Sequence, residues 1–254
     1  MYLTGNESDT KRNKFYLQQK QSNFPVIKGI LFDVDGTLYY QMPLRVIILF
    51  YFVFSNIHNP RALIRKLRVI TRYRRIQETL REFPHIQKDC LLRQFSLTAE
   101  TTKESLGFVS TTIKEWFEKK PLPFLSLCRR IRMKSTIRYL HRKGIKLGVY
   151  SDYPIGGKLH FLGISQYIST ILSADDPFVY GFKPNTNGFI IAANRMELDP
   201  SEVLYVGDRP EVDGAGARRA GMQVIILRNL LKKKGSAHYP SVSSFNDLVK
   251  VLKA

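Results

Sequence analysis

The chain has 254 residues, of which 44% are hydrophobic and 24% charged, and its formal net charge is +19. This length and composition argue against a disordered chain and allow a sizeable core in one or two domains. Two cysteines, Cys90 and Cys128, argue against a disulfide framework and favour a reducing compartment. The excess of 40 Lys and Arg over 21 Asp and Glu will attract anionic partners, such as nucleic acid, anionic lipid or a phosphorylated metabolite, without choosing between them.

The first 25 residues are polar and basic and lack the apolar segment of a secretory signal. We therefore expect residues 1–25 to form a mobile tail and the protein to be cytoplasmic. A first strand is predicted at Val26–Phe32, and it ends on two closely spaced carboxylates, Asp33 and Asp35. In so basic a chain, this pair at the end of a buried strand requires an explanation.

The most apolar segment of the chain, residues 46–54, is about half of the ~20 residues that a membrane span needs. We expect it to form a buried helix, with interfacial contact to a membrane as the alternative. Residues 61–81 then carry apolar side chains at steps of three and four and a strongly basic face. That pattern predicts an amphipathic helix, whose arginines we interpret mainly as a solvated face, with binding to a multiply anionic substrate as the alternative.

Helical patterning continues over residues 89–119, and Pro121 and Pro123 interrupt it. Residues 41–122 are therefore predicted to be an all-helical insert. Strands and helices alternate after it: strands are expected at 145–150, 170–172, 203–206 and 223–227, and helices at 135–143, 158–162, 189–196 and 212–220. This alternation predicts an α/β fold, a Rossmann-like three-layer α/β/α parallel sheet formed by residues 26–40 and 123–254.

Polar side chains follow three of the predicted strands, at the sheet edge where ligands bind in such folds. They are Asp33 and Asp35, then Ser151 and Asp152, then Asp208 and Asp213; Lys183 precedes a helix. Carboxylates that converge repel one another unless a divalent cation binds them, and oxygen ligands suit Mg²⁺. A lysine and a hydroxyl beside such a metal can hold phosphoryl oxygens, and a carboxylate can attack phosphorus. These residue types therefore predict metal-assisted phosphoryl transfer.

The same residues resemble the four motifs of the haloacid dehalogenase-like (HAD) superfamily. The matching positions, in that family's order, are Asp33-Val-Asp35-Gly-Thr37-Leu38, Ser151, Lys183 and Gly207-Asp208 through Asp213. The resemblance covers about residues 26–230, and within the superfamily the layout is similar to that of phosphoglycolate phosphatases. It implies that residues 41–122 form a helical cap over the core.

The resemblance also implies roles at each matching position. Asp33 would be the nucleophile and a Mg²⁺ ligand, while Asp35 would be the general acid/base, with its backbone carbonyl on the metal. Thr37 would fix the loop and help to bind phosphate, Ser151 would bind the transferring phosphoryl group, and Lys183 would neutralise Asp33 and phosphate. Asp208 would ligate Mg²⁺, and Asp213 would support that ligation or orient Lys183. Asp152 and Asp213 have an alternative reading as caps of the helices that follow them.

Asp35 favours phosphatase over dehalogenase chemistry, because an alkoxide leaving group needs a proton and a halide does not. We therefore predict a Mg²⁺-dependent phosphatase that acts on a small phosphorylated metabolite. A phosphomutase or phosphotransferase would keep the same acid and stays open. A third hypothesis is a binding protein on this fold, attached to RNA or an anionic membrane through the basic helix at 61–81.

Overall fold

A six-stranded parallel sheet lies at the centre of the structure, a computed structural model that describes residues 26–82, 89–228 and 238–253. The strands are β1 (Gly29–Phe32), β2 (Lys146–Ser151), β3 (Thr170–Ser173), β4 (Val203–Gly207), β5 (Gln223–Leu227) and β6 (Ser241–Val242). They lie in the order β3-β2-β1-β4-β5-β6, and each pair of neighbours is parallel. The predicted α/β class with a parallel sheet is confirmed.

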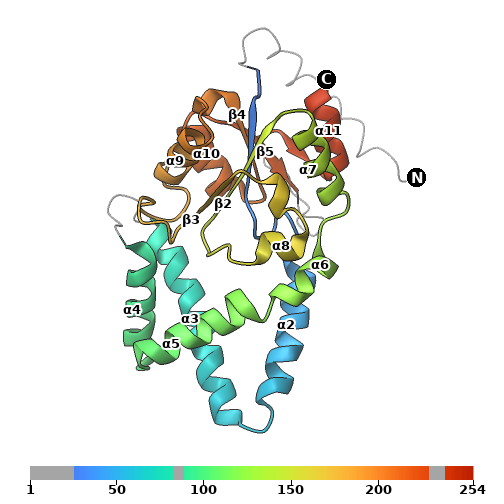
Figure 1. Ribbon diagram of the computed structural model, residues 1–254. Helices are drawn as coiled ribbons and strands as arrows, with labels where there is room; N and C mark the ends of the chain where they lie inside the picture. Colours follow the sequence, from blue (N-terminus) through green and yellow to red (C-terminus); the bar gives the residue numbers. More distant parts are fainter. Residues whose placement is uncertain (1–25, 83–88, 229–237, 254) are drawn as a thin grey trace, which may run out of the picture.

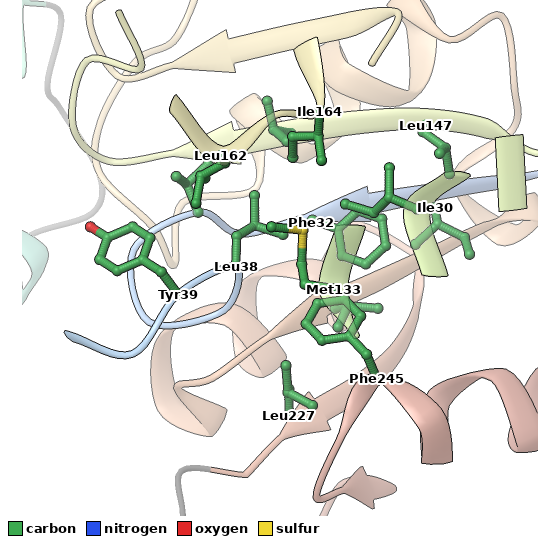
Figure 2. Packing of buried hydrophobic residues seen from close by; sticks show 14 of the residues in the cluster. Ile30, Phe32, Leu38, Tyr39, Met133, Leu147, Leu162, Ile164, Leu227 and Phe245 are labelled. Atoms are coloured by element: carbon green, nitrogen blue, oxygen red, sulfur yellow. The ribbon is translucent and has the colours of Figure 1, made fainter. Parts of the chain in front are cut away.

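Helices cover both faces of this sheet (Figure 1). One layer holds α7 (Met133–Arg142), α8 (Lys158–Leu162) and α11 (Phe245–Lys253), and the other holds α9 (Asn187–Arg195) and α10 (Ala215–Arg219). In β1, Ile30 and Phe32 pack with Met133 and Phe245 on the first side (Figure 2), whereas Leu31 belongs to the core on the second. Because both faces are buried, the central strands are apolar throughout instead of alternating with polar residues. The expected three-layer arrangement is confirmed.

Between β1 and α7 most of the described residues are helical, and these helices lie together toward one end of the sheet (Figure 1). They are α2 (Gln41–Asn56), α3 (Pro60–Glu82), α4 (Cys90–Thr102) and α5 (Leu106–Ile113), followed by the π-helical turn η1 (Lys114–Lys119), the 3₁₀ turn η2 (Leu122–Phe124) and α6 (Leu125–Cys128). Tyr39 and Arg129 form an antiparallel bridge where the chain leaves and rejoins the core. The run of α5 and η1 ends at Lys119, so the interruption expected at Pro121 and Pro123 is present, and only short helical turns follow it.

The prediction of a buried helix at residues 46–54 is correct for the helix and wrong for its burial. In α2 the buried residues are Leu44, Phe52 and Asn56, whereas Phe50 and Phe54 are 61% and 68% exposed. The helix is apolar on two sides, and one of these sides packs on its neighbours. On that side Phe52 meets Trp116 edge-on, with ring centroids 4.6 Å apart.

The remaining predictions concern the two ends of the chain and the possibility of a membrane-spanning helix. The expected tail at residues 1–25 lies outside the described residues. Strand β6 was not predicted, because a two-residue strand carries almost no pattern. Helix α11 was also missed, although its nine residues are amphipathic. Within the described ranges, no helix combines the length and hydropathy required to cross a bilayer.

Candidate active site

The carboxyl ends of three adjacent strands place the predicted residues at one edge of the sheet. Phe32 of β1 is in register with Val149 of β2 and Val206 of β4. The residues that follow, Asp33, Ser151 and Asp208, therefore emerge side by side although they lie far apart in the sequence. A cleft of about 800 Å³ opens there, and its walls include seven of the eight residues singled out from the sequence: Asp33, Asp35, Ser151, Asp152, Lys183, Asp208 and Asp213.

Asp33 is 5% exposed and is held by contacts to both of its carboxylate oxygens. Lys183 Nζ lies 2.6 Å from Oδ1, and the Thr37 hydroxyl donates a hydrogen bond of 2.9 Å to Oδ2. Thr37 itself is fully buried beneath the cleft, and its hydroxyl positions Asp33. Burial raises the pKa of Asp33 well above its usual value; Lys183 opposes this effect, and Asp213, Asp208 and Asp35 add to it.

Lys183 is a buried cation shared between two carboxylates. Its Nζ lies 2.6 Å from Asp33, 2.8 Å from Asp213 and 3.1 Å from the Tyr205 hydroxyl. Burial alone would lower the pKa of this lysine, but Asp213 and Asp33 outweigh burial and raise its pKa well above the usual value. The lysine therefore stays charged and fixes the orientation of Asp33.

Asp213 is a supporting residue for the loop after β4 and not a cap of the helix that follows. Its Oδ2 accepts hydrogen bonds from the backbone N–H groups of Asp208 (3.2 Å) and Arg209 (3.0 Å), which precede it in the chain. Its Oδ1 accepts from Lys183 and from the Tyr205 hydroxyl. The helix-cap alternative is therefore wrong for this residue.

Asp35 is held by three side-chain donors. Lys158 Nζ lies 2.9 Å and 3.0 Å from its two oxygens, Ser151 Oγ donates at 3.0 Å, and the Tyr39 hydroxyl also donates to it. Burial acts to raise the pKa of Asp35, but Lys158, Tyr39 and Ser151 together lower the pKa below its usual value. Without substrate, these donors therefore stabilise the carboxylate form of Asp35, and the Ser151 hydroxyl is engaged with it.

Asp152 joins the loop after β2 to the loop of Lys183 and to α3. Its Oδ1 accepts a hydrogen bond of 2.8 Å from the Lys183 backbone N–H, and its Oδ2 accepts one of 2.6 Å from Arg81. Arg81 donates a second hydrogen bond of 2.6 Å to the Lys183 carbonyl. Asp152 is therefore not a helix cap either: it ties the predicted lysine to a helix of the insert.

Three carboxylates lie close enough together to hold a cation. One oxygen each of Asp33, Asp208 and Asp213 lies within 4.8 Å of the others. The chain passes very near this cluster at Gly36, where a Cβ atom would come within 2.5 Å of Asp208 and where φ is +107°. A glycine is required at that position both by the space and by the backbone conformation. An all-oxygen donor set of this kind fits a hard divalent cation such as Mg²⁺.

Several residues of the cleft were not singled out from the sequence. Lys158 and Tyr39 contact Asp35, Tyr205 contacts Lys183, and Gln41 donates 2.8 Å to the backbone carbonyl of Asp35. Lys158 is 6% exposed and begins a short, mainly apolar helix, and this position was the one signal that the sequence offered for it. Its partner lies 123 positions away, so the contact itself has no sequence signature.

The insert supplies the opposite wall of the cleft. That wall combines apolar and aromatic side chains with arginines: Met42, Ile48, Leu49, Phe52, Leu67, Ile70, Trp116 and Phe117, and Arg45, Arg74 and Arg81. The arginines of the basic helix α3 therefore fall into two groups. Arg74 and Arg81 line the cleft, whereas Arg61, Arg68 and Arg72 are exposed and do not line it.

Comparison with known proteins gives the family. A family model for haloacid dehalogenase-like hydrolases matches residues 27–221. A glyceraldehyde 3-phosphate phosphatase from Methanopyrus kandleri is 31% identical over 214 residues, which are 80% of this chain and 84% of that protein. A phosphoglycolate phosphatase from Escherichia coli is 33% identical over 86 residues, which are 32% of this chain and 33% of that protein. The chain belongs to the haloacid dehalogenase-like hydrolase family and is an enzyme of that class.

Solved structures agree on the fold. A 2-haloacid dehalogenase from Pseudomonas syringae pv. Tomato has a TM-score of 0.62 at 23% identity, covering 90% of this chain and 99% of that chain. The magnesium-bound HAD-hydrolase YfnB from Bacillus subtilis has a TM-score of 0.65 at 16% identity, covering 91% and 100%. In both comparisons the similarity in fold extends over about nine-tenths of this chain and nearly all of the other.

Proposed function

We propose that this protein is a Mg²⁺-dependent phosphatase that hydrolyses a small phosphomonoester through an aspartyl-phosphate on Asp33. The observation that carries the proposal is the convergence of Asp33, Lys183 and Asp35 at the floor of one open cleft. Its curated relatives are named as phosphatases of glyceraldehyde 3-phosphate and of phosphoglycolate, which supports a small phosphorylated substrate. As part of the proposal, residues 41–122 form a cap and residues 26–40 and 123–254 form the core.

The first half of the reaction forms the phosphoenzyme. A carboxylate oxygen of Asp33 attacks phosphorus, the bond from phosphorus to the alcohol oxygen breaks, and Asp35 donates its proton to that oxygen. Lys183 stays beside Asp33 and stabilises the negative charge of the phosphoryl group. Ser151 and Asp35 share a hydrogen bond, so a phosphoryl oxygen that reached the Ser151 hydroxyl would lie next to the acid.

The second half releases phosphate. Asp35, now a carboxylate, takes a proton from water, the water oxygen bonds to phosphorus, and the bond from phosphorus to Asp33 breaks. The donors that lower the pKa of Asp35 hold it as the carboxylate that this step needs, whereas the negative charge of a bound substrate phosphate favours the protonated form that the first step needs. The products are the free alcohol and inorganic phosphate, and Asp35 is left with the proton that the next turnover needs.

The carboxylate cluster fits the metal that this family resemblance implies. Asp33 and Asp208 would hold Mg²⁺, together with the Asp35 backbone carbonyl that Gln41 contacts in this structure. Asp213 already accepts hydrogen bonds from Lys183 and two backbone N–H groups, so we assign it a supporting role. When bound, Mg²⁺ would offset the repulsion between these carboxylates and the phosphate.

The direct test replaces Asp33 by asparagine, which keeps the shape of the side chain and removes the nucleophile. With an aryl phosphate and Mg²⁺, we expect Asp33→Asn to lose at least about a thousandfold in kcat. Asp247→Asn, a partly exposed carboxylate in α11, is the matched control and should keep full activity. Retention of wild-type turnover by Asp33→Asn would refute the proposal.

The same assay separates hydrolysis from transfer to a second hydroxyl. A phosphatase releases one inorganic phosphate for each alcohol formed, whereas a phosphomutase consumes substrate and releases little phosphate. We expect equal amounts of the two products.

A further inference from the structure

An exposed apolar surface lies on the hairpin of α2 and α3, outside the proposed active site. We call it the hairpin patch, and its six side chains are between 38% and 68% exposed: Val46, Phe50, Val53, Phe54, Ile57 and Ile64. The first five follow one another along α2 at steps of three or four, or as direct neighbours, so they form one stripe. Isolated exposed apolar residues are ordinary, but a continuous stripe marks an interaction site.

Packing of the insert does not explain this stripe. The opposite side of α2 already makes the contacts that hold the helix in place, through Leu44, Phe52 and the ring contact of Tyr51 with Trp116. None of the six side chains of the hairpin patch lines the cleft. The stripe is therefore a second apolar face, one that neither the core nor the proposed site uses.

The charged residues of the hairpin between residues 41 and 77 are all basic, although Arg65 is paired with Glu104 from outside this stretch. From residue 41 to residue 77 the chain has eight basic residues and no acidic ones: Arg45, Arg61, Arg65, Lys66, Arg68, Arg72, Arg74 and Arg75. Arg61 and Arg68 are exposed on α3 within two turns of the connection to α2. Figure 1 shows that the turn between these helices projects farther from the sheet than any other part of the insert.

The combination of an exposed apolar stripe with exposed arginines favours one class of partner. A second copy of the chain would bring two basic hairpins together, which costs free energy through like-charge repulsion. Nucleic acid would satisfy the arginines but would leave aliphatic side chains such as Val53 and Ile57 without a role. The surface of an anionic membrane satisfies both, because its headgroups attract cations and its acyl boundary accepts apolar side chains.

We propose that the α2–α3 hairpin docks on the surface of an anionic membrane, with the hairpin patch in the headgroup region. At 16 residues α2 is too short to cross the bilayer, so the helix lies along the surface. Phe50 and Phe54 enter the apolar boundary, and Arg61 and Arg68 contact lipid phosphates. No residue of the proposed catalytic set takes part, so this proposal and the phosphatase proposal can fail separately.

The test is co-sedimentation of the full chain with vesicles, either of phosphatidylcholine alone or of phosphatidylcholine mixed with phosphatidylglycerol. We expect binding to the mixed vesicles, weakened by salt, and roughly tenfold or more lower affinity for the double variant Phe50→Ser/Phe54→Ser. The double variant Arg61→Glu/Arg68→Glu should lose at least about tenfold. Phe178→Ser is the matched control, because Phe178 is 63% exposed and lies outside the hairpin, and it should bind as wild type.

Circular dichroism and phosphatase activity show whether each variant is folded, and Val53→Ser/Ile57→Ser provides a second apolar pair. Three results would overturn the proposal. One is equal or absent binding to both kinds of vesicle. The second is binding to anionic vesicles that neither apolar pair affects. The third is a dimer, seen by sedimentation velocity without vesicle binding, that the Phe50/Phe54 variant disrupts. Binding of RNA with no dependence on the apolar pairs, and no binding to vesicles, would likewise assign the surface to nucleic acid.

Discussion

At Asp35, a lysine, a tyrosine and a serine all donate to one carboxylate, and their combined effect is to lower its pKa although burial would raise it. Lys158 contributes the only full positive charge among these three donors, and it contacts both oxygens. It is therefore the donor whose removal should change the titration of Asp35 most.

Replacing Lys158 by methionine should shift the pH profile of kcat/KM to higher pH. Without the lysine, the carboxylate loses a stabilising charge, so the pKa of Asp35 rises. The parts of the pH profile that depend on proton donation and on proton acceptance by Asp35 then both move to higher pH. The control variant Lys146→Met removes a lysine that pairs with Glu197 at the N-terminal end of β2. Its pH profile of kcat/KM should be unchanged. An unmoved profile, or one shifted to lower pH, would contradict the assigned contact.

Lys183 presents the opposite case, in which two buried carboxylates depend on one cation. Replacing Lys183 by methionine leaves Asp33 and Asp213 without their shared partner, and we expect it to cost about 3–5 kcal/mol of unfolding free energy. Urea denaturation measures this loss. The double variant Lys183→Met/Asp213→Asn removes one of the stranded charges and should recover part of the stability without recovering activity. If both variants were equally unstable, the loss would have another cause.

At the level of elements, α3 is tied to the core at two points of different strength. Arg81 and Asp152 form a pair whose side chains are 8% and 7% exposed, whereas Arg209 and Glu78 are 34% and 52% exposed. A buried pair depends on its partner, and an exposed pair is screened by water. The inner contact is therefore the one that holds α3 against the loop of Lys183.

We expect Arg81→Met to destabilise the protein by about 3 kcal/mol, because it strands the Asp152 carboxylate. Arg209→Met should cost less than about 1 kcal/mol. Because Asp152 also accepts from the Lys183 backbone, Arg81→Met should lower kcat as well. Chemical denaturation and steady-state kinetics on the two variants provide the comparison. Equal effects from both would show that burial does not distinguish the two contacts.

The sequence predicts five of the six strands, because each of these five contains a short apolar run that is followed by a polar residue or a glycine. It also places the acids and Lys183 at the sheet edge, since strand ends and helix starts are local features. Lys158 and Arg81 escape such reasoning because their partners lie 123 and 71 positions away. For α2, periodicity identifies a helix but cannot say which of its two apolar sides finds a partner.

At the scale of the whole molecule, the strand order brings together residues that are dispersed over 181 positions of the chain, from Asp33 to Asp213. With β1 between β2 and β4, the loops after these three strands meet, and the helical insert faces them across the cleft. The hairpin of the insert also carries exposed arginines, among them Arg61, Arg68 and Arg72. The proposed active site and the proposed membrane contact therefore use different faces of α2.

The central claim is that Asp33 carries the phosphoryl group during turnover. Rapid acid quenching of the full chain with Mg²⁺ and a radiolabelled phosphomonoester, followed by peptide mapping, tests it most directly. We expect labelled phosphate on the peptide that contains Asp33, none in Asp33→Asn, and none when Mg²⁺ is removed with EDTA. Product release by the wild-type protein with no labelled peptide, or with the label on a different residue, would contradict the account.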